Sequence, residues 1–357
     1  MVKSSTDTIN KQQIDELFGR FNSLRIMIVG DVMLDSYLFG NVDRISPEAP
    51  VPVVAVRSRS NRLGGAANVA LNIHALGAVP VLVSVVGNDQ RGKEFLQTLE
   101  ANDMPGNGIF VSNNRITTTK FRIIGNNVQM LRVDDEMTDD ISLEEENMLL
   151  NSVQSILNHE RIDAIVFQDY DKGVLTPNLI ENIIAMAFEK NIPVAVDPKK
   201  KNFMSYRKVQ LFKPNLKELR DGLNLQFNPN SISEIIEAVN RLQTILETSI
   251  VMTTLSDKGV VVSEKTKEGH YKTTHIAAHL RTIADVSGAG DSVISVASLC
   301  LALKVDAGLM AILSNLAGGL VCEEVGVVPV NKNKLHDELL KLVETYYFDK
   351  QRKKLIS

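Results

Sequence analysis

Residues 285–291 are the strongest candidate for chemistry in this sequence. They read Asp-Val-Ser-Gly-Ala-Gly-Asp and lead into an apolar stretch, residues 292–303, with the pattern of a buried helix. The small residues Gly288, Ala289 and Gly290 leave main-chain N–H groups unobstructed at a helix N-terminus, where partial positive charge favours an anion. The pattern predicts a binding place for the charge that develops on a transferred phosphoryl group.

Asp291 falls in the first turn of that predicted helix, beside the anion-binding backbone. A carboxylate there could take a proton from an attacking hydroxyl. An acidic residue in a first turn also stabilises a helix by roughly 0.3 to 1 kcal/mol, whatever the function. The Gly-Ala-Gly run favours the catalytic interpretation, because glycine weakens a helix and is useful mainly where something approaches the backbone closely.

A second glycine motif, residues 64–70, opens another predicted helix. Gly64 and Gly65 could bring the backbone close to a ligand, and the Asn68 amide could both donate to and accept from a sugar hydroxyl. The alternative is an ordinary helix start with Asn68 exposed. Alone, this motif does not decide between the two.

Four further residues could hold a substrate. Asp31 and Asp35 follow the predicted buried strand 25–29, at the edge where open α/β sheets bind ligands, and their carboxylates could accept bonds from several hydroxyls. Lys172 and Arg44 are candidates for an anionic group on the substrate, because a cation beside a neutral sugar has no obvious partner. A solvated side chain is the alternative for Lys172.

These residues need a scaffold, and the apolar pattern predicts one. Buried strands alternate with helices, which implies an α/β fold with a mostly parallel sheet and helices on both faces. The predicted strands are 25–29, 81–86, 164–167, 194–196, 209–212 and 250–253, and the predicted helices are 14–21, 66–76, 91–101, 143–157, 178–189 and 232–246.

Two stretches interrupt that alternation and predict a small separate sheet. Residues 50–56 form one strand, and 117–124 with 127–133 form a hairpin turning at Gly125 and Asn126. With the neighbouring residues, lid strands are expected near 36–57 and 117–134. Such a sheet serves as a lid over a ligand or as a subunit interface, and we expect a homodimer through it.

Composition bounds the function. Hydrophobic residues make up 44% and charged residues 23% of the 357, which fits a globular protein. The net charge of -4 argues against a nucleic-acid binder. No apolar run is long enough to cross a membrane, and Cys300 and Cys322 offer neither a disulfide framework nor a zinc site, so we expect a cytoplasmic protein. His275 and His279 are in a strand-turn context, which argues against a metal site.

Taken together, residues 64–70 and 285–291 resemble the two signatures of the ribokinase-like (PfkB) carbohydrate kinases. Within that family the chain resembles the heptose-7-phosphate kinases of ADP-heptose biosynthesis, which are sometimes fused to an adenylyltransferase. The resemblance spans residues 25 to about 330. It also rests on the stretches 29–35, 44–53, 131–134, 169–175, 213–218 and 275–279, of which Arg-Ile-Ser-Pro-Glu-Ala-Pro in 44–53 points to the heptose branch.

The resemblance implies transfer of the γ-phosphoryl group of ATP to a sugar hydroxyl, with Asp291 as base and residues 288–290 as the anion hole. It implies Mg²⁺ held mostly through waters and phosphates. Asn215 and Glu218 match the family's Asn-x-x-Glu motif, which organises those waters. Their alternative role is a helix capping box, with Asn215 as N-cap and Glu218 at the third position.

The resemblance also places the nucleotide and a second cation. Lys213 precedes the Asn-x-x-Glu motif, and adenosine is expected at the turn that contains Thr254, Ser256 and Gly259, where Ser256 replaces a glycine of many members. Asp285 matches a position that helps to hold a monovalent cation, K⁺, with carbonyls of residues 324–328. Equally, Asp285 could cap the glycine turn.

The expected function is phosphorylation of D-glycero-D-manno-heptose 7-phosphate at O1. The alternatives are another sugar or sugar-phosphate kinase of this fold and a non-catalytic sugar-phosphate binding protein. The last is disfavoured because Asp291, Asn215 and Glu218 are all present. An adenylyltransferase is not expected, since no His-x-Gly-His follows a strand. The expected organisation is an extension over 1–22, a kinase domain over 23–335 and a C-terminal helix or tail over 336–357.

Overall fold

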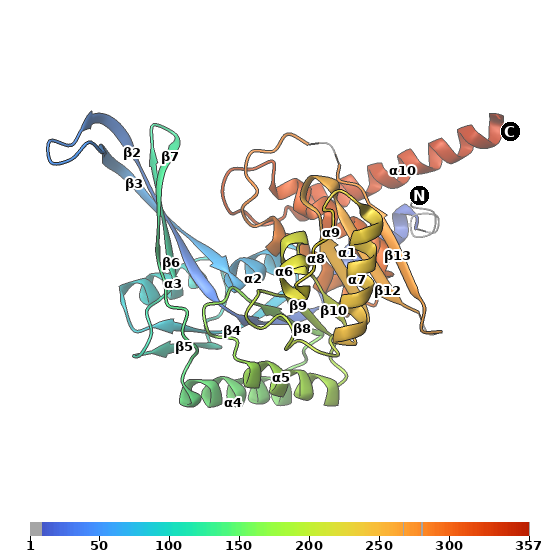
Figure 1. Cartoon of the computed structure of the whole chain (residues 1–357), viewed down its shortest axis with the longest axis horizontal. Coiled ribbons are helices and arrows are strands. Elements are labelled where there is room, and N and C mark those ends of the chain that lie inside the picture. Colours follow the sequence, from blue (N-terminus) through green and yellow to red (C-terminus); the bar gives the residue numbers. More distant parts are fainter. Residues whose placement is uncertain (1–8, 267, 280, 357) are drawn as a thin grey trace.

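The computed structural model describes residues 9–266, 268–279 and 281–356. Its strands form a nine-stranded sheet, in the order β13-β12-β11-β10-β9-β8-β1-β4-β5, and a four-stranded sheet, β3-β2-β6-β7, which stands off the body of the molecule (Figure 1). The predicted α/β architecture with a small lid sheet is confirmed.

The main sheet is parallel except at one edge. β1 (Arg25–Gly30) lies in the middle and pairs in parallel with β4 (Val79–Gly87) and β8 (Ala164–Gln168). Parallel pairing continues through β5 (Ile109–Ser112) on one side and β9 (Val194–Asp197), β10 (Leu211–Phe212) and β11 (Ile250–Thr254) on the other. β12 (Val260–Lys265) and β13 (Tyr271–Ile276) complete the edge as antiparallel strands.

Helices cover both faces because the central strands are apolar on both. In β1, Ile26 and Ile28 face one core while Met27 and Val29 face the other, as the two-residue period of a strand requires. The first core contains residues of α1 (Lys11–Phe21), α2 (Ala66–Ala75), α3 (Gln90–Glu100), α8 (Ala289–Ala302), α9 (Ala307–Val321) and α10 (Lys332–Ile356). The second contains residues of α4 (Leu143–His159), α5 (Pro177–Glu189), α6 (Leu216–Leu223) and α7 (Ile232–Leu246).

The lid consists of two long strands and a hairpin. β2 (Val32–Ile45) pairs antiparallel with β3 (Pro52–Gly65) and in parallel with β6 (Thr119–Gly125), which turns back into β7 (Val128–Asp135). β2 begins directly after β1, so Asp35 lies within a lid strand. Asp35 follows the first strand, as expected, but it does so inside a second strand and not in a loop.

The hairpin turn is also displaced by one residue from the prediction. Asn126 and Asn127 have φ angles of 52° and 63°, and they connect β6 to β7. Asparagine tolerates this left-handed region better than most residues, and two such residues match the twist of a hairpin. Gly125, predicted in the turn, is the last residue of β6.

Helices near the two ends of the chain pack together. The rings of Phe18 in α1 and His336 in α10 meet edge to face at 5.1 Å, and His336 Nε2 lies 2.7 Å from Asp15 Oδ1. α10 begins at Lys332 and crosses the expected boundary at 335. Residues 1–8 and 357 of the expected terminal segments lie outside the described residues, and the domain boundaries stay a prediction.

The described residues contain neither a membrane-spanning helix nor a metal-binding cluster. No helix there combines the length and the apolar composition that a membrane span requires. No group of three or more His, Cys, Asp or Glu side chains there is arranged to hold a metal ion. Cys300 and Cys322 are buried thiols, and the His275 ring contacts the Lys258 carbonyl at 2.8 Å.

Candidate active site

The N-terminus of α8 brings the glycine motif and Asp291 to the carboxyl ends of the central strands. Gly288 is the N-cap residue, with a φ of 80° that favours glycine. A Cβ on Gly288 would lie 3.1 Å from the Asn68 amide nitrogen, so the two predicted motifs meet here. Asp291 follows in the first turn and is buried.

Three side chains hold the Asp291 carboxylate. Its Oδ2 accepts a hydrogen bond from Asn68 Nδ2 at 2.6 Å, and its Oδ1 accepts from the Tyr170 hydroxyl at 2.7 Å and from Gln168 Nε2 at 3.0 Å. A carboxylate has about four acceptor positions. The arrangement therefore fixes the orientation of Asp291 and leaves capacity for one more donor, such as a substrate hydroxyl.

Burial shifts the pKa of this carboxylate. Burial raises the pKa of Asp291 to about 6, against the hydrogen bonds from Asn68 and Tyr170, which lower it. Asp197 raises the pKa further and Lys213 lowers it. A carboxylate with this pKa is ionised at neutral pH yet more basic than an exposed one, as a general base should be.

Asn68 orients the Asp291 carboxylate. It is fully buried, its Nδ2 donates to Asp291, and its Oδ1 accepts from Asn72 Nδ2 at 3.3 Å. The alternative of an exposed helix start is wrong, because Asn68 is fully buried. The binding of a sugar hydroxyl by its amide stays a prediction. Asn68 is a positioning residue.

Gly64 and Gly65 let β3 pack closely against the start of the lid. A Cβ on Gly64 would lie 2.5 Å from Asp35 Oδ2, and one on Gly65 would lie 2.3 Å from the Asp31 carbonyl oxygen. Gly65 also has a φ of 60°. Neighbouring protein atoms therefore require both glycines, the Asp35 carboxylate at Gly64 and the Asp31 carbonyl at Gly65.

Asp31 holds a loop. Its carboxylate oxygens accept hydrogen bonds from the main-chain N–H groups of Tyr170, Lys172 and Val174 at 2.8, 3.2 and 3.0 Å. Burial raises the pKa of Asp31, although these three bonds act to lower it. These bonds commit the Asp31 carboxylate to the loop that carries Tyr170, and its predicted binding of sugar hydroxyls stays a prediction.

Asp35 is a buried carboxylate that pairs with an arginine of the lid. It is 3% exposed and lies beside Gly64, and its Oδ1 accepts from Arg122 Nη1 of β6 at 2.5 Å. Its carboxylate and that of Asp291 are linked by the Gly64–Asn68 segment, which touches both.

The structure does not bring Lys172 and Arg44 together. Lys172 Nζ forms an ion pair with Glu136 Oε1 at 2.8 Å, so its side chain is neither solvated nor unpartnered. Arg44 is exposed near the far end of β2, nine residues beyond Asp35. At about 3.3 Å per residue, that is roughly 30 Å along the strand.

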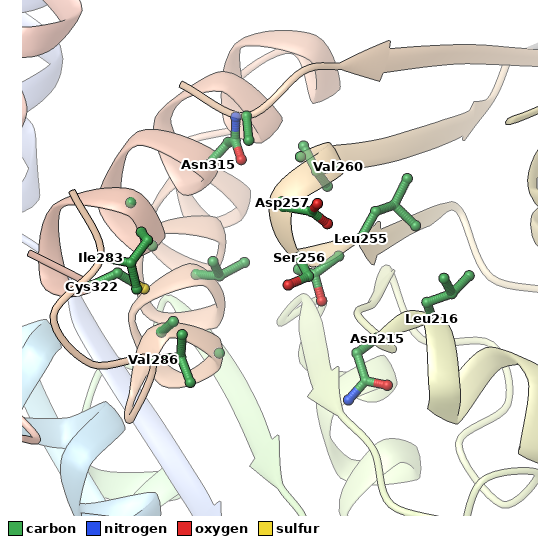
Figure 2. A pocket seen from close by; sticks show the side chains of 18 of the residues that line it. Asn215, Leu216, Leu255, Ser256, Asp257, Val260, Ile283, Val286, Asn315 and Cys322 are labelled. Carbon is green, nitrogen blue, oxygen red and sulfur yellow. The ribbon is translucent and has the colours of Figure 1, made fainter. Parts of the chain in front are cut away.

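A cavity of about 670 Å³ adjoins the glycine turn on the side of β11 and α9. Figure 2 shows Asn215 and Ser256 facing it from one side and Ile283, Val286 and Cys322 from the other. Thr254, Gly259, Ala289 and Gly290 also line it. It has the size and mostly apolar lining of a small-molecule site, and it contains the residues expected around adenosine.

The turn at the edge of this cavity contains Ser256, which stands where many members of the family have glycine. Ser256 has a φ of 58°, in the region that favours glycine, so the conformation is kept although the residue differs. Gly259 has a φ of 86°, and a Cβ there would lie 2.0 Å from the Ile276 carbonyl oxygen.

Asn215 and Glu218 form a capping box at the start of α6. Asn215 Oδ1 accepts from the Glu218 N–H, and Glu218 Oε2 accepts from the Asn215 N–H, both at 2.8 Å. Glu218 Oε1 forms an ion pair with Lys199, whose Nζ lies 5.5 Å from the centre of the Tyr170 ring. Burial acts to lower the pKa of Lys199, but Asp197 and Glu218 outweigh it and raise the pKa.

Lys213 lies beside the anion hole. It is 3% exposed, and its Nζ is 3.0 Å from Asp197 Oδ1. A Cβ on Gly290 would lie 3.8 Å from this nitrogen. A buried cation at this distance from the start of α8 could stabilise charge on a transferred phosphoryl group.

Asp285 caps the glycine turn. Its Oδ1 accepts from the Ser287 N–H and its Oδ2 from the Gly326 N–H, both at 2.9 Å. Burial acts to raise the pKa of Asp285, but these backbone bonds outweigh it and lower the pKa. Nearby carbonyls of Val325 and Val327 accept from Arg62, at 3.4 and 3.2 Å.

Sequence reasoning missed Gln168, Tyr170, Asp197 and Lys199. Gln168 and Asp197 end β8 and β9, and Tyr170 and Lys199 follow two residues later. The available signal was their place at the carboxyl ends of adjacent parallel strands. A position at a strand end does not show whether the side chain points toward the site.

Comparisons with known proteins agree with this geometry. Residues 23–333 match the model of the pfkB family of carbohydrate kinases. The bifunctional protein HldE of Methylobacillus flagellatus is 38% identical over 95% of this chain and 67% of its own length, and that of Koribacter versatilis is 39% identical over 88% and 63%. The chain thus spans about two thirds of the length of these relatives.

Solved structures share the fold at low sequence identity. Phosphofructokinase-2 from Escherichia coli, in complex with potassium, aligns with a TM-score of 0.72 and 17% identity over 90% of this chain and 99% of its own. Ribokinase from Arabidopsis thaliana, complexed with ribose and ATP, aligns with a TM-score of 0.66 and 16% identity over 88% and 98%. Because the family model covers most of the chain and the relatives exceed 30% identity, this chain belongs to the pfkB family of carbohydrate kinases.

Proposed function

We propose that this protein transfers the γ-phosphoryl group of ATP to O1 of D-glycero-D-manno-heptose 7-phosphate, giving the 1,7-bisphosphate used in ADP-heptose and lipopolysaccharide synthesis. The observation that carries the kinase chemistry is Asp291, a buried carboxylate fixed beside a helix N-terminus and a cavity of nucleotide size. The heptose substrate is supported by the relatives called HldE and by the stretch at residues 44–53.

In this proposal the chain's own residues align the reactants. Asp291 accepts the proton of the sugar hydroxyl, while Asn68, Tyr170 and Gln168 keep its carboxylate oriented. Backbone N–H groups at the start of α8, with Lys213 nearby, stabilise the charge on the transferred phosphoryl group.

Mg²⁺, when bound with ATP, would neutralise part of the charge of the nucleotide phosphates. The chain offers a fitting side chain because Glu218 is an acidic residue in the first turn of α6, and the preceding residues of that helix start, among them Asn215, line the nucleotide cavity. Its Oε1 is held by Lys199 and its Oε2 by the helix start. Such a carboxylate suits binding through metal-bound water.

Asp285 is proposed to hold K⁺ together with main-chain carbonyls of residues 324–328. Two of those carbonyls accept hydrogen bonds from Arg62, so a bound K⁺ must share them with a guanidinium. Activity with KCl, compared with a K⁺-free and Na⁺-free buffer of equal ionic strength, tests this assignment. Equal rates would remove the cation site and leave Asp285 as a cap.

We also propose that two copies pair through the lid. Several large apolar side chains on lid strands are exposed, among them Val56, Val128, Leu131 and Val133 at 45, 62, 54 and 45%. Apolar residues on exposed strands mark an interaction surface or an aggregation hazard, and pairing of two lids would cover them.

A substrate panel tests the proposed function. Purified protein with ATP and Mg²⁺ is offered heptose 7-phosphate, unphosphorylated heptose, fructose 6-phosphate and ribose, and ADP release is measured. Heptose 7-phosphate should give the highest kcat/KM, and Asp291→Asn controls for contaminating kinases. A preference for fructose 6-phosphate or ribose would establish the alternative, another sugar or sugar-phosphate kinase. If no sugar of the panel leads to ADP release, a non-catalytic sugar-phosphate binding protein would be favoured.

A further inference from the structure

We propose that Arg62 and Arg122, two arginines from neighbouring lid strands, form the site for the phosphate group that the sugar already carries. This inference rests on the proposed function, because it concerns a substrate with a phosphate at the end remote from the reacting hydroxyl. It replaces Lys172 and Arg44 as the residues that recognise that phosphate.

The register of the lid places these arginines on one face. In the pairing of β2 with β3, Arg62 stands opposite Asp35, and in the pairing of β2 with β6, Arg122 stands opposite Tyr37. Asp35 and Tyr37 are two residues apart in β2 and therefore share a face. Residues directly opposite one another on paired strands project to the same side, so all four side chains belong to one surface.

The contacts of this surface show that it faces the body of the molecule. Arg62 Nη1 donates to the carbonyls of Val327 and Val325, in the loop after α9. A Cβ on Gly326 would lie 3.4 Å from the Tyr37 hydroxyl oxygen. The arginine face is thus the inner face of the lid, turned toward the site.

Tyr37 brings the two guanidinium groups together. The guanidinium carbons of Arg62 and Arg122 lie 4.9 and 5.2 Å from the centre of its ring. Cation–π contact orients each planar group without neutralising its charge. Two oriented guanidinium groups offer several N–H donors, a geometry that suits a phosphate.

Charge partners distinguish Arg62 from the other cations on the lid's inner side. Lys120 pairs with Asp134 and Glu136, and Lys172 also pairs with Glu136. Arg122, the second arginine of the proposed site, pairs with Asp35. Arg62 donates to neutral main-chain carbonyls, and no ion pair joins it to a carboxylate within the described ranges. Its positive charge is available to an anionic ligand.

A chain of contacts leads from the base to these arginines. Asp291 touches Asn68, the segment from Asn68 back to Gly64 reaches Asp35, and Asp35 touches Arg122. A sugar whose hydroxyls lie on Asp35 and whose reacting hydroxyl lies on Asp291 directs its other end toward Arg122 and Arg62. This order suits a sugar phosphorylated at the end opposite to the reaction.

The test compares paired substrates in matched variants. Arg62→Met and Arg122→Met are assayed with heptose 7-phosphate and with unphosphorylated heptose, beside Arg59→Met as control. Arg59 is exposed on the same strand but opposite Leu38, so it projects from the other face of the lid. A charge-assisted hydrogen bond is worth about 1.5 to 3 kcal/mol, which corresponds to roughly 10- to 100-fold.

We expect Arg62→Met to lose at least about tenfold more kcat/KM with the phosphorylated sugar than with the unphosphorylated one. Arg122→Met should lose activity with both, because it also holds Asp35, but more with the phosphorylated sugar. Arg59→Met should behave like the unmodified protein. Equal losses of Arg62→Met on both sugars would show that the arginine only braces the lid and would overturn the inference.

Two further controls are needed, one for a misfolded variant and one for a substrate other than heptose 7-phosphate. Arg62→Gln keeps a donor for the Val327 carbonyl and removes the charge, so it should reproduce the selective loss if Arg62→Met is poorly folded. If the unmodified protein rejects heptose 7-phosphate but uses another sugar phosphate, the proposed function fails and the comparison is repeated with that sugar. If it prefers unphosphorylated sugars throughout, the phosphate site itself is overturned.

Discussion

At the scale of single residues, the site is built around one buried carboxylate. Asp291 must be ionised to accept a proton, yet burial favours its neutral form, and the pKa of about 6 is the resulting balance. Asn68 and Tyr170 favour the ionised form by donating to it. Two predictions follow from this balance, one on the rate when Asp291 is replaced and one on the pH profile when Tyr170 is replaced.

Replacing Asp291 by Asn should lower kcat by about 10² to 10⁴, the usual contribution of a positioned general base. The nucleotide cavity should be unaffected, since Asp291 is not among its lining residues. Steady-state kinetics and ADP binding by calorimetry give the two values. A variant with more than half of the original turnover would remove Asp291 from the mechanism.

The pH profile should report the same carboxylate. Below about pH 6, protonation of Asp291 should reduce kcat/KM about tenfold per pH unit. Tyr170→Phe removes a hydrogen bond that lowers this pKa, so the acid limb should move to higher pH. Tyr206→Phe is the control, because Tyr206 donates to Asp169 instead. An acid limb that stays in place in Tyr170→Phe would show that Tyr170 does not tune the base.

At the scale of elements, helix starts carry the site, and each serves structure and chemistry at once. The start of α8 is the proposed anion site, while the start of α6 lines the cavity through Asn215 and carries Glu218 one turn further on. The sequence could not decide between capping and metal organisation for Asn215 and Glu218, because the same atoms can do both. The structure shows the cap, and the metal role stays a prediction.

Glu218→Gln separates the two roles. Glutamine can keep the capping box but removes the charge that would organise metal-bound water. The Mg²⁺ concentration for half-maximal rate should rise about 10- to 100-fold, the usual effect of an outer-sphere partner, with little change in melting temperature. Glu145→Gln is the matched control, since Glu145 closes the capping box of α4. Unchanged Mg²⁺ dependence with a lower melting temperature would leave only the cap.

At the scale of the whole molecule, the fold was more predictable than the site. Buried parallel strands are continuous apolar runs, so β1, β4, β8, β9 and β11 were each expected within a few residues. Side-chain direction was not predictable in the same way. Asp31 and Asp35 are four residues apart, yet the first clamps a loop of the body and the second belongs to the lid, because a new strand begins between them.

The proposed lid dimer gives a prediction at this scale. Leu131→Glu should weaken self-association at least about tenfold, as loss of a central apolar contact does. Phe188→Glu is the control, because Phe188 is 78% exposed on α5, away from the lid. Sedimentation equilibrium of the three proteins measures the effect. A monomeric unmodified protein, or a Leu131→Glu variant that associates as strongly, would contradict a dimer built on this surface.

The packing of α1 against α10 has a practical consequence for experiments on single molecules. Both helices lie on the side of the molecule away from the lid (Figure 1), joined by the Phe18–His336 and Asp15–His336 contacts. An anchor attached through α10 would therefore hold the body to a surface while leaving the lid directed outward. A fluorescent dye on the exposed Ser58 of β3 would then report the lid's position relative to the anchored body, one molecule at a time.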